Sequence, residues 1–135
     1  MKLLLDHNCS PKIARALHAL VEPVHEVRHL REKFAPATTD QDWVKALSFE
    51  RGWAIATLDR RIRKRPHERE AWRRSRLVLF ALEPAWGGET MNPMLQTARM
   101  IQWWPRWVQI FEEVEPPAAF LVPLRASSKL KQLRS

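Results

Sequence analysis

The sequence predicts an α/β domain with a mainly parallel sheet. Short apolar runs typical of strands alternate along the chain with segments in which apolar residues recur at helical spacing. Three of these runs are almost uninterrupted, as expected for strands of a sheet that is covered on both faces. A length of 135 residues suits one domain with a sizeable core and leaves no room for a second domain of ordinary size.

In the first half of the chain, capping residues mark two helix starts. Ser10 is a favoured N-cap residue, and Pro11 suits the first helical turn because its missing N–H would have no partner there. Thr39 and Asp42 fit a capping box, with Asp in place of the usual Glu. In order, we predict a strand at Lys2–Leu5, a helix at 11–20, a strand at Val24–Leu30, a loop at 31–38 and a helix from Thr39 to Gly52.

The second half continues the alternation and contains a long helix. Pro66 suits the first turn of a basic helix, and Asn92 is a favoured cap for the long one. Pro105 lies inside the long helix and is expected to kink it. In order, we predict a strand at Trp53–Leu58, a helix at 66–74, a strand at Leu77–Leu82, a loop at 83–90, a helix at about 92–114 and a strand at Ala119–Leu124. These elements complete a single domain at 1–124, which is followed by a basic tail at 125–135.

The composition excludes several classes of protein. The single cysteine, Cys9, rules out an internal disulfide framework and a zinc site with several cysteines. No apolar stretch approaches the roughly 18 residues of a membrane-spanning helix. The apolar run Leu3–Leu5 stops at Asp6 and is too short for the hydrophobic part of a signal peptide. We therefore expect a cytoplasmic protein that does not enter a membrane.

Four acids are predicted to lie at one edge of the sheet. Asp6 and Asp59 each follow a predicted strand, and the carboxyl ends of parallel strands carry the ligand sites of open α/β sheets. Asp40 and Asp42 begin the helix between those two strands and are expected at the same edge. Gathered carboxylates repel one another unless a cation lies between them, and Mg²⁺ and Mn²⁺ prefer oxygen ligands. The pattern predicts metal-dependent hydrolysis of a phosphodiester.

Each acid also has an ordinary structural explanation. Asp6 could cap the turn after its strand, and Asp42 could serve only the capping box. Asp40 could complement the helix dipole, and Asp59 could form a surface ion pair with Arg60. The prediction therefore depends on the convergence of several acids on one edge.

Three segments resemble the motifs of the bacterial PIN-like domain family. The opening Leu3–Pro11, LLLDHNCSP, resembles the L-L-D-x-N-x-S-P start of these proteins. The segment 39–43 lies where they carry an acid-rich helix start, and 56–62 resembles their strand-end T-x-D motif. The order and spacing agree across residues 1–82, with the closest resemblance to the PIN-like toxins of toxin–antitoxin systems.

The resemblance implies a three-layer α/β/α domain whose acids hold Mg²⁺ or Mn²⁺ and cleave RNA. By this resemblance Asp6, Asp40 and Asp59 would be metal ligands and catalytic residues, with Asp42 as the alternative to Asp40. Asn8 would support the metal site from beside Asp6. A cognate antitoxin would be a partner of such a toxin.

Two positions depart from the family pattern. Arg61 stands where many members carry a second strand-end acid, and His7 stands where an acid or Asn is common. A smaller number of acids leaves open a catalytically silent module that binds nucleic acid or protein.

The charge distribution favours RNA as the polyanionic partner. The chain has 23 Lys and Arg against 15 Asp and Glu, a formal charge of +8. Nine of these cations lie between Arg60 and Arg76, beside Asp59, with only two acids among them. A solvated basic surface is the alternative. The residues expected to hold the RNA backbone are Arg60, Arg61, Arg63, Lys64 and Arg65.

The long helix is apolar on more than one side. Met100, Trp103 and Trp107 share one face, and Leu95, Ile101, Trp104 and Phe111 belong to a second stripe. Tryptophans at helical spacing are more often core than base-stacking residues. The second stripe would be covered by a homodimer or by an antitoxin segment, and a protein-interaction subunit is the rival function.

Overall fold

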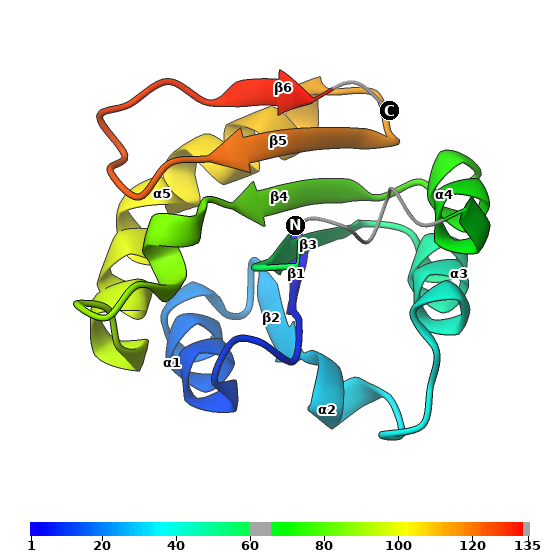
Figure 1. The fold of residues 1–135 in the computed structure, drawn as a ribbon, viewed down its shortest axis with the longest axis horizontal. Helices are drawn as coiled ribbons and strands as arrows, with labels where there is room; N and C mark the ends of the chain where they lie inside the picture. Colours follow the sequence, from blue (N-terminus) through cyan, green and yellow to red (C-terminus); the bar gives the residue numbers. More distant parts are fainter. Residues whose placement is uncertain (60–65, 134–135) are drawn as a thin grey trace.

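The computed structural model describes residues 1–59 and 66–133, which form a six-stranded sheet with helices on both faces (Figure 1). The strand order is β2-β1-β3-β4-β5-β6. Neighbouring strands from β2 to β5 are parallel, and β6 is antiparallel to β5. The strands are β1 (Lys2–Leu5), β2 (Glu26–His29), β3 (Trp53–Thr57), β4 (Val78–Leu82), β5 (Ala118–Val122) and β6 (Lys131–Leu133).

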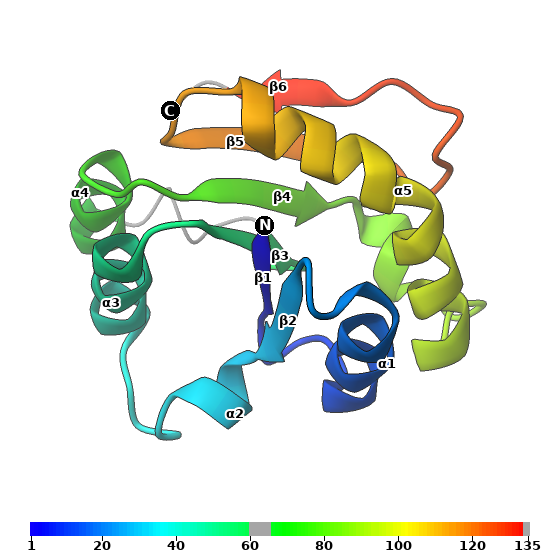
Figure 2. The same ribbon diagram turned by 180° about the vertical axis from the view of Figure 1, so that it is seen from behind.

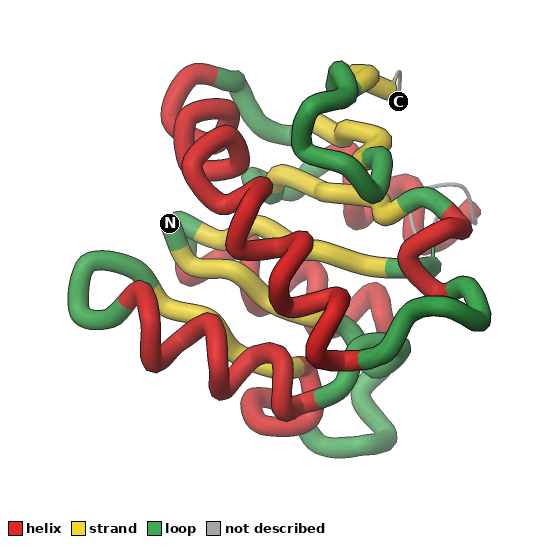
Figure 3. The backbone as a smooth tube through the Cα atoms, turned by 90° about the vertical axis from the view of Figure 1, so that its left-hand side faces the viewer, coloured by secondary structure: helices red, strands yellow, loops and turns green. Residues whose placement is uncertain are grey.

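Two helices cover each face of the sheet. On one face α1 (Pro11–Val21) lies beside the long helix α5 (Pro93–Glu113), and on the other α3 (Asp40–Glu50) lies beside α4 (Pro66–Arg73) (Figure 2). Figure 3 shows helices in front of the strands and behind them. A single turn, α2 (Leu30–Lys33), and a 3-10 turn at Pro84–Gly87 complete the described elements. The predicted α/β/α layers and the mainly parallel sheet are confirmed.

Alternating strand residues build a separate core on each face. Leu3 and Leu5 pack in the cluster beneath α1 and α5, whereas Leu4 packs in the cluster beneath α3 and α4. Trp103 and Trp107 are fully buried in the first cluster, where Trp107 stacks on Phe80 with 4.8 Å between ring centroids. These two tryptophans are therefore core residues and are not available to stack on bases.

Side-chain caps begin the helices where the sequence predicts them. Ser10 Oγ accepts the Lys12 N–H at 3.2 Å, and Thr39 Oγ1 accepts the Asp42 N–H at 3.1 Å. Asn92 begins α5 in the same way, and α5 continues through Pro105 as one helix. No helix among the described residues combines the length and the apolar character that crossing a membrane requires.

Two elements differ from the sequence prediction. The loop expected after Leu30 begins with the helical turn α2, which follows directly on β2. The basic segment after Leu124 contains β6, which pairs with β5 over Lys131–Leu133 at the edge of the sheet.

The order of the strands creates a switch point between β1 and β3. The chain passes from β1 to β2 on one side and then returns to place β3 on the other side of β1. The crossover helices α1 and α3 lie on opposite faces of the sheet. A crevice outside the carboxyl ends of β1 and β3 is the general location of ligand sites in such sheets.

Candidate functional site

Asp6 is the buried acid at this switch point. It follows β1 directly and is 2% exposed. Its Oδ1 accepts the backbone N–H of Asn8 at 2.8 Å, and its Oδ2 accepts the hydroxyl hydrogen of Thr57. Because two donors hold the carboxylate from opposite sides, its orientation is fixed by the backbone turn after β1 and by the neighbouring strand β3.

The strand register explains why Thr57 reaches Asp6. Leu4 pairs with Ile55 and Leu5 with Ala56, so the next positions along the two strands bring Asp6 beside Thr57. Thr57 is fully buried, and its hydroxyl also accepts the backbone N–H of Asp59 at 2.9 Å. One hydroxyl therefore links the two acids that follow β1 and β3.

Asp59 lies beyond the end of β3 and is partly exposed. The Thr57 bridge fixes its backbone next to the Asp6 carboxylate. The prediction that these two acids share one edge of the sheet is consistent with this geometry. Asp6 contributes a buried, oriented carboxylate, and Asp59 contributes one that solvent can reach.

Asp40 and Asp42 occupy the first turn of α3, as predicted, and have local roles there. Asp40 Oδ1 accepts the indole N–H of Trp43 at 2.9 Å. Asp42 is exposed, and its backbone N–H is the donor to the capping hydroxyl of Thr39. The Thr39 half of the capping box is therefore formed, and it uses the backbone of Asp42 and not its carboxylate.

The structure does not bring Asp6, Asp40 and Asp59 together as a three-carboxylate metal site. Among residues 1–59 and 66–133, no group of three or more His, Cys, Asp and Glu side chains could hold a metal ion. A smaller donor set remains in the carboxylates of Asp6 and Asp59. Mg²⁺ commonly takes one or two carboxylates and completes its shell with waters and substrate phosphates, so this pair fits such an ion by its donor chemistry.

The turn after β1 carries the other residues singled out from this motif. Asn8 contacts Asp6 through its backbone N–H, while its side chain lies at the surface. His7 is half exposed, with Nδ1 3.4 Å from Asp6 Oδ1. His7 therefore lies beside the Asp6 carboxylate, on the side that solvent reaches.

Cys9 is buried and unreactive in this environment. Burial raises the pKa of the Cys9 thiol to about 12, and the negative charge of Asp6 adds to the increase. The thiol therefore stays protonated at neutral pH. A nucleophilic role for Cys9 is excluded.

His29 is the site residue that the sequence did not reveal. It ends β2, is fully buried, and accepts the Arg31 N–H on Nδ1 at 3.0 Å. Because Nδ1 accepts, the proton lies on Nε2, which donates to the Cys9 carbonyl at 2.7 Å. His29 thereby ties the turn that orients Asp6 to the end of the next strand. A histidine at a strand end, directly before a helical turn, was the available signal.

The basic residues expected to hold RNA, Arg60, Arg61, Arg63, Lys64 and Arg65, lie outside the described residues. They follow Asp59 directly in the chain. Their role in RNA binding remains a prediction.

Comparison with known proteins adds one finding. A family model described as "PIN like domain" matches residues 1–84, which is more than half of the chain. The matched region contains β1 to β4 and therefore both acids of the switch point. No curated protein and no solved structure matches the chain.

Proposed function

Because the chain belongs to the PIN-like domain family, whose members are generally nucleases, we propose that it is a metal-dependent endoribonuclease that hydrolyses RNA phosphodiester bonds. The observation that supports this proposal best is the pair of acids at the switch point, Asp6 and Asp59, joined through the Thr57 hydroxyl. A buried carboxylate whose two oxygens have fixed donors is an oriented ligand, and the backbone of a second, partly exposed aspartate is held next to it.

In this proposal Asp6 and Asp59 hold Mg²⁺ or Mn²⁺ together with the substrate phosphate. The bound ion would supply an activated water nucleophile and stabilise the leaving oxygen. Asp6 orients the site because Thr57 and the Asn8 N–H restrict its carboxylate. Asp59, which is partly exposed, would be the acid nearer to the approaching RNA. The cations after Asp59, Arg60–Arg65, would hold the RNA backbone across the acids.

A toxin in a toxin–antitoxin pair is the more specific role that we propose, and its partners would dock on the apolar face of α1 and α5. A cavity of about 580 Å³ lies between these helices, and its lining is mainly apolar. Met94 beside it is 80% exposed and Ile101 is 45% exposed. An antitoxin segment or a second copy of the chain would cover this face, and the mass of the purified protein in solution, alone and with its neighbouring gene product, distinguishes the two.

The cleavage test compares wild type with Asp6→Asn and Asp59→Asn on mixed RNAs in Mg²⁺ or Mn²⁺. Both substitutions remove a charge and keep an oxygen acceptor, so we expect folding to be retained and cleavage to be lost. Glu89→Gln, at an exposed loop position, is the matched control for the charge change. Circular dichroism of each variant separates loss of chemistry from loss of fold. If both aspartate variants cleave as well as wild type, the assignment is wrong.

Two further variants decide the roles of the acids at the start of α3. Asp40→Asn should reduce cleavage if Asp40 joins the metal site when substrate binds, and Asp42→Asn should leave cleavage unchanged if its role is the capping box alone. A different outcome is that wild type binds RNA equally well with and without EDTA and does not cleave it. That result would identify a catalytically silent binding module, which the small number of acids at the switch point favours.

A further inference from the structure

A cationic cavity lies at the edge of the sheet opposite to Asp6 and Asp59. Its volume is about 730 Å³, and it lies between α3, along which its lining extends from Gln41 to Arg51, and the last turn of α4. The chain leaves α3 into β3 and leaves α4 into β4, so the cavity is beside the amino ends of these strands. A strand of five residues spans roughly 17 Å, which is the approximate separation of the two edges.

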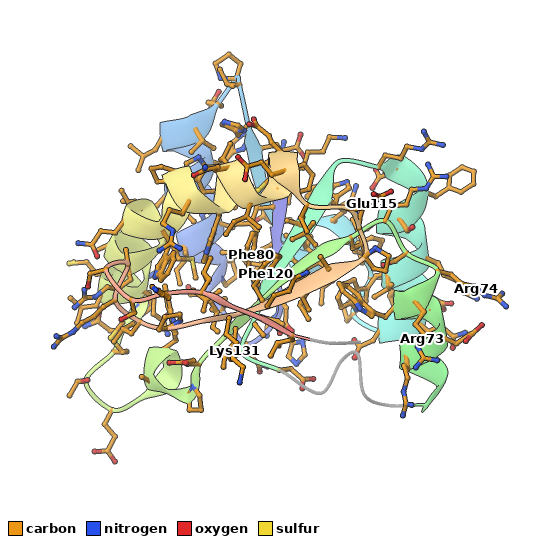
Figure 4. The ribbon with its side chains drawn as sticks, turned by 90° about the horizontal axis from the view of Figure 1, so that it is seen from above. Arg73, Arg74, Phe80, Glu115, Phe120 and Lys131 are labelled. Atoms are coloured by element: carbon orange, nitrogen blue, oxygen red, sulfur yellow. The ribbon has the colours of Figure 1, made fainter. Side chains whose placement is uncertain are left out.

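Four of the ten residues that line the cavity are cations. Lys45 and Arg51 come from the α3 side, and Arg74 and Arg76 come from the α4 side. The acid in the lining, Glu70, is already paired with Arg74 at 2.9 Å. Figure 4 shows Arg74 at the outer end of α4, directed away from the sheet. Within the described part of the chain, Lys45, Arg51 and Arg76 have no ion-pair partner, so the cavity keeps a net positive charge.

An exposed aromatic ring stands at the same cavity. Phe49 is 92% exposed, the highest exposure among the large hydrophobic residues described. Its ring therefore contributes almost nothing to the core of the protein. An aromatic face beside free cations is the arrangement with which proteins bind single-stranded nucleic acid, because a base stacks on the ring while its phosphates meet the cations.

The backbone at Arg51 is strained. Arg51 has φ 66° and ψ 155°, a region that is essentially restricted to glycine, and it is followed by Gly52 at φ 83°. Among the described residues Arg51 alone has a positive φ without being glycine. Folding stability would favour a glycine here, so an arginine at this strained position is consistent with a binding role for its side chain.

We propose that this cavity binds one nucleotide unit of a single-stranded RNA, with the base on Phe49 and the flanking phosphates on Lys45, Arg51 and Arg76. The site is distinct from the acids that would cleave RNA. An acidic protein segment is the less suitable occupant, because its carboxylates would meet the cations but would leave the exposed ring of Phe49 without a planar base to stack on. An RNA strand held here would run along α3 towards Asp40. The distance along the helix axis from Phe49 to Asp40, nine positions apart, is about 14 Å.

The test measures binding of an end-labelled oligouridylate of about 16 nucleotides, long enough for the site sizes of small single-strand-binding domains. EDTA is present throughout, so that cleavage does not contribute and a failure of the proposed nuclease would not affect the result. We expect Phe49→Ala to weaken binding at least about fivefold. Val24→Ala, at another highly exposed apolar position in the turn before β2, is the matched control and should not change binding.

The cations are tested by salt dependence and by stability together. Arg76→Gln should make the log–log slope of affinity against salt less steep by about 0.7, the value for one phosphate contact of a single strand. Arg15→Gln on α1 is the matched charge control and should leave the slope unchanged. Arg51→Gly should weaken binding while the melting temperature stays the same or rises, because glycine relieves the strain.

Three results would overturn the proposal. The first is unchanged binding in both Phe49→Ala and Arg76→Gln. The second is weaker binding in Arg76→Gln with no effect of Phe49→Ala, since the cavity would then hold an anion without a base. The third is competition by polyglutamate as strong as that by unlabelled oligouridylate, which would identify an acidic protein segment as the ligand.

Discussion

Removing the Thr57 hydroxyl is the most direct perturbation of the candidate site. In Thr57→Val the side chain keeps the β-branched shape that suits a buried strand and loses only its polar atom. That hydroxyl donates to Asp6 Oδ2 and accepts the Asp59 N–H. The variant therefore leaves a buried carboxylate oxygen and a backbone N–H without these partners.

The magnitude follows from the two hydrogen bonds. A hydrogen bond to a charged group contributes about 1.5–3 kcal/mol, and one between neutral groups contributes about 0.5–1.5 kcal/mol. Water cannot take the place of the hydroxyl readily, because Asp6 is 2% exposed and Thr57 is fully buried. We expect the free energy of unfolding to fall by about 2–4 kcal/mol, out of a typical total of roughly 5–15 kcal/mol.

Urea unfolding followed by fluorescence of the seven tryptophans measures this loss. With an m-value of about 2 kcal/mol/M, the midpoint should fall by about 1–2 M while m stays constant. Thr57→Ser keeps the hydroxyl and loses a methyl group, so it should cost about 1 kcal/mol and retain cleavage. Thr57→Val should reduce cleavage, because the two carboxylates lose their common anchor.

A double-mutant cycle shows whether the cost belongs to the Asp6 bond. In the Asp6→Asn background the charge-assisted part is absent, so Thr57→Val should cost at least about 1 kcal/mol less there than in wild type. The reasoning is refuted if Thr57→Val costs less than about 0.5 kcal/mol in wild type. It is refuted equally if the cost is the same in both backgrounds.

Three further predictions concern the turn after β1, the first helix and the basic segment. Burial and the charge of Asp6 raise the pKa of the Cys9 thiol from 9.0 to about 12, so the stability that this protonated thiol contributes is complete below pH 9 and is lost as the pH rises towards 12. Relative to Cys9→Ala, wild type should therefore lose about 1.4 kcal/mol of unfolding free energy between pH 8 and pH 10 in urea titrations, and a constant difference would contradict the pKa. Ser10→Ala should cost about 1 kcal/mol in thermal unfolding because Lys12 loses its capping acceptor, whereas Ser127→Ala in an exposed loop should have no effect. If the cations of Arg60–Arg65 contact about five phosphates, RNA binding in EDTA should show a log–log salt slope near −3.5, and a slope that stays the same when these cations are replaced by Gln would exclude them.

Local signals in the sequence predicted most of the fold. Ser10, Thr39 and Asn92 cap helices within one or two residues of the predicted starts, because N-cap chemistry acts over a single turn. The apolar runs of β1, β3 and β4 predicted parallel strands, because burial on both faces leaves a continuous pattern. Elements that depend on distant partners could not be read in this way. The strand β6 is short and polar, and pairing with β5 is what makes it a strand.

The sequence predicted where the candidate site lies, but it did not predict the hydrogen bonds that join the residues of the site. Strand ends placed Asp6 and Asp59 at one edge, and the order of the strands made that edge a switch point. The Thr57 bridge depends on the register of β1 against β3, which no local pattern encodes. Asp40 begins its helix at the predicted position, but its carboxylate accepts the Trp43 indole N–H, a contact set by the packing of α3 on the sheet. The cationic cavity likewise requires the contact between α3 and α4, because Lys45 and Arg76 are 31 positions apart in the sequence.

The separation of charge between the two edges limits how an RNA can approach Asp6 and Asp59. The five residues of β3, roughly 17 Å of extended strand, separate Arg51 in the cavity from Asp59, which is about twice the Debye length of about 8 Å at physiological salt. Arg51 therefore does little to offset the repulsion between the acids and a phosphate. Asp6 is held in place by Thr57 and cannot turn away from the site. The positive charge that lets a phosphodiester reach it must therefore act at the carboxyl edge itself. A divalent cation held by the two acids would supply it, and so would Arg60 and Arg61, which follow Asp59 in the chain. In the proposed function cleavage requires the divalent cation, whereas binding without cleavage requires only the arginines.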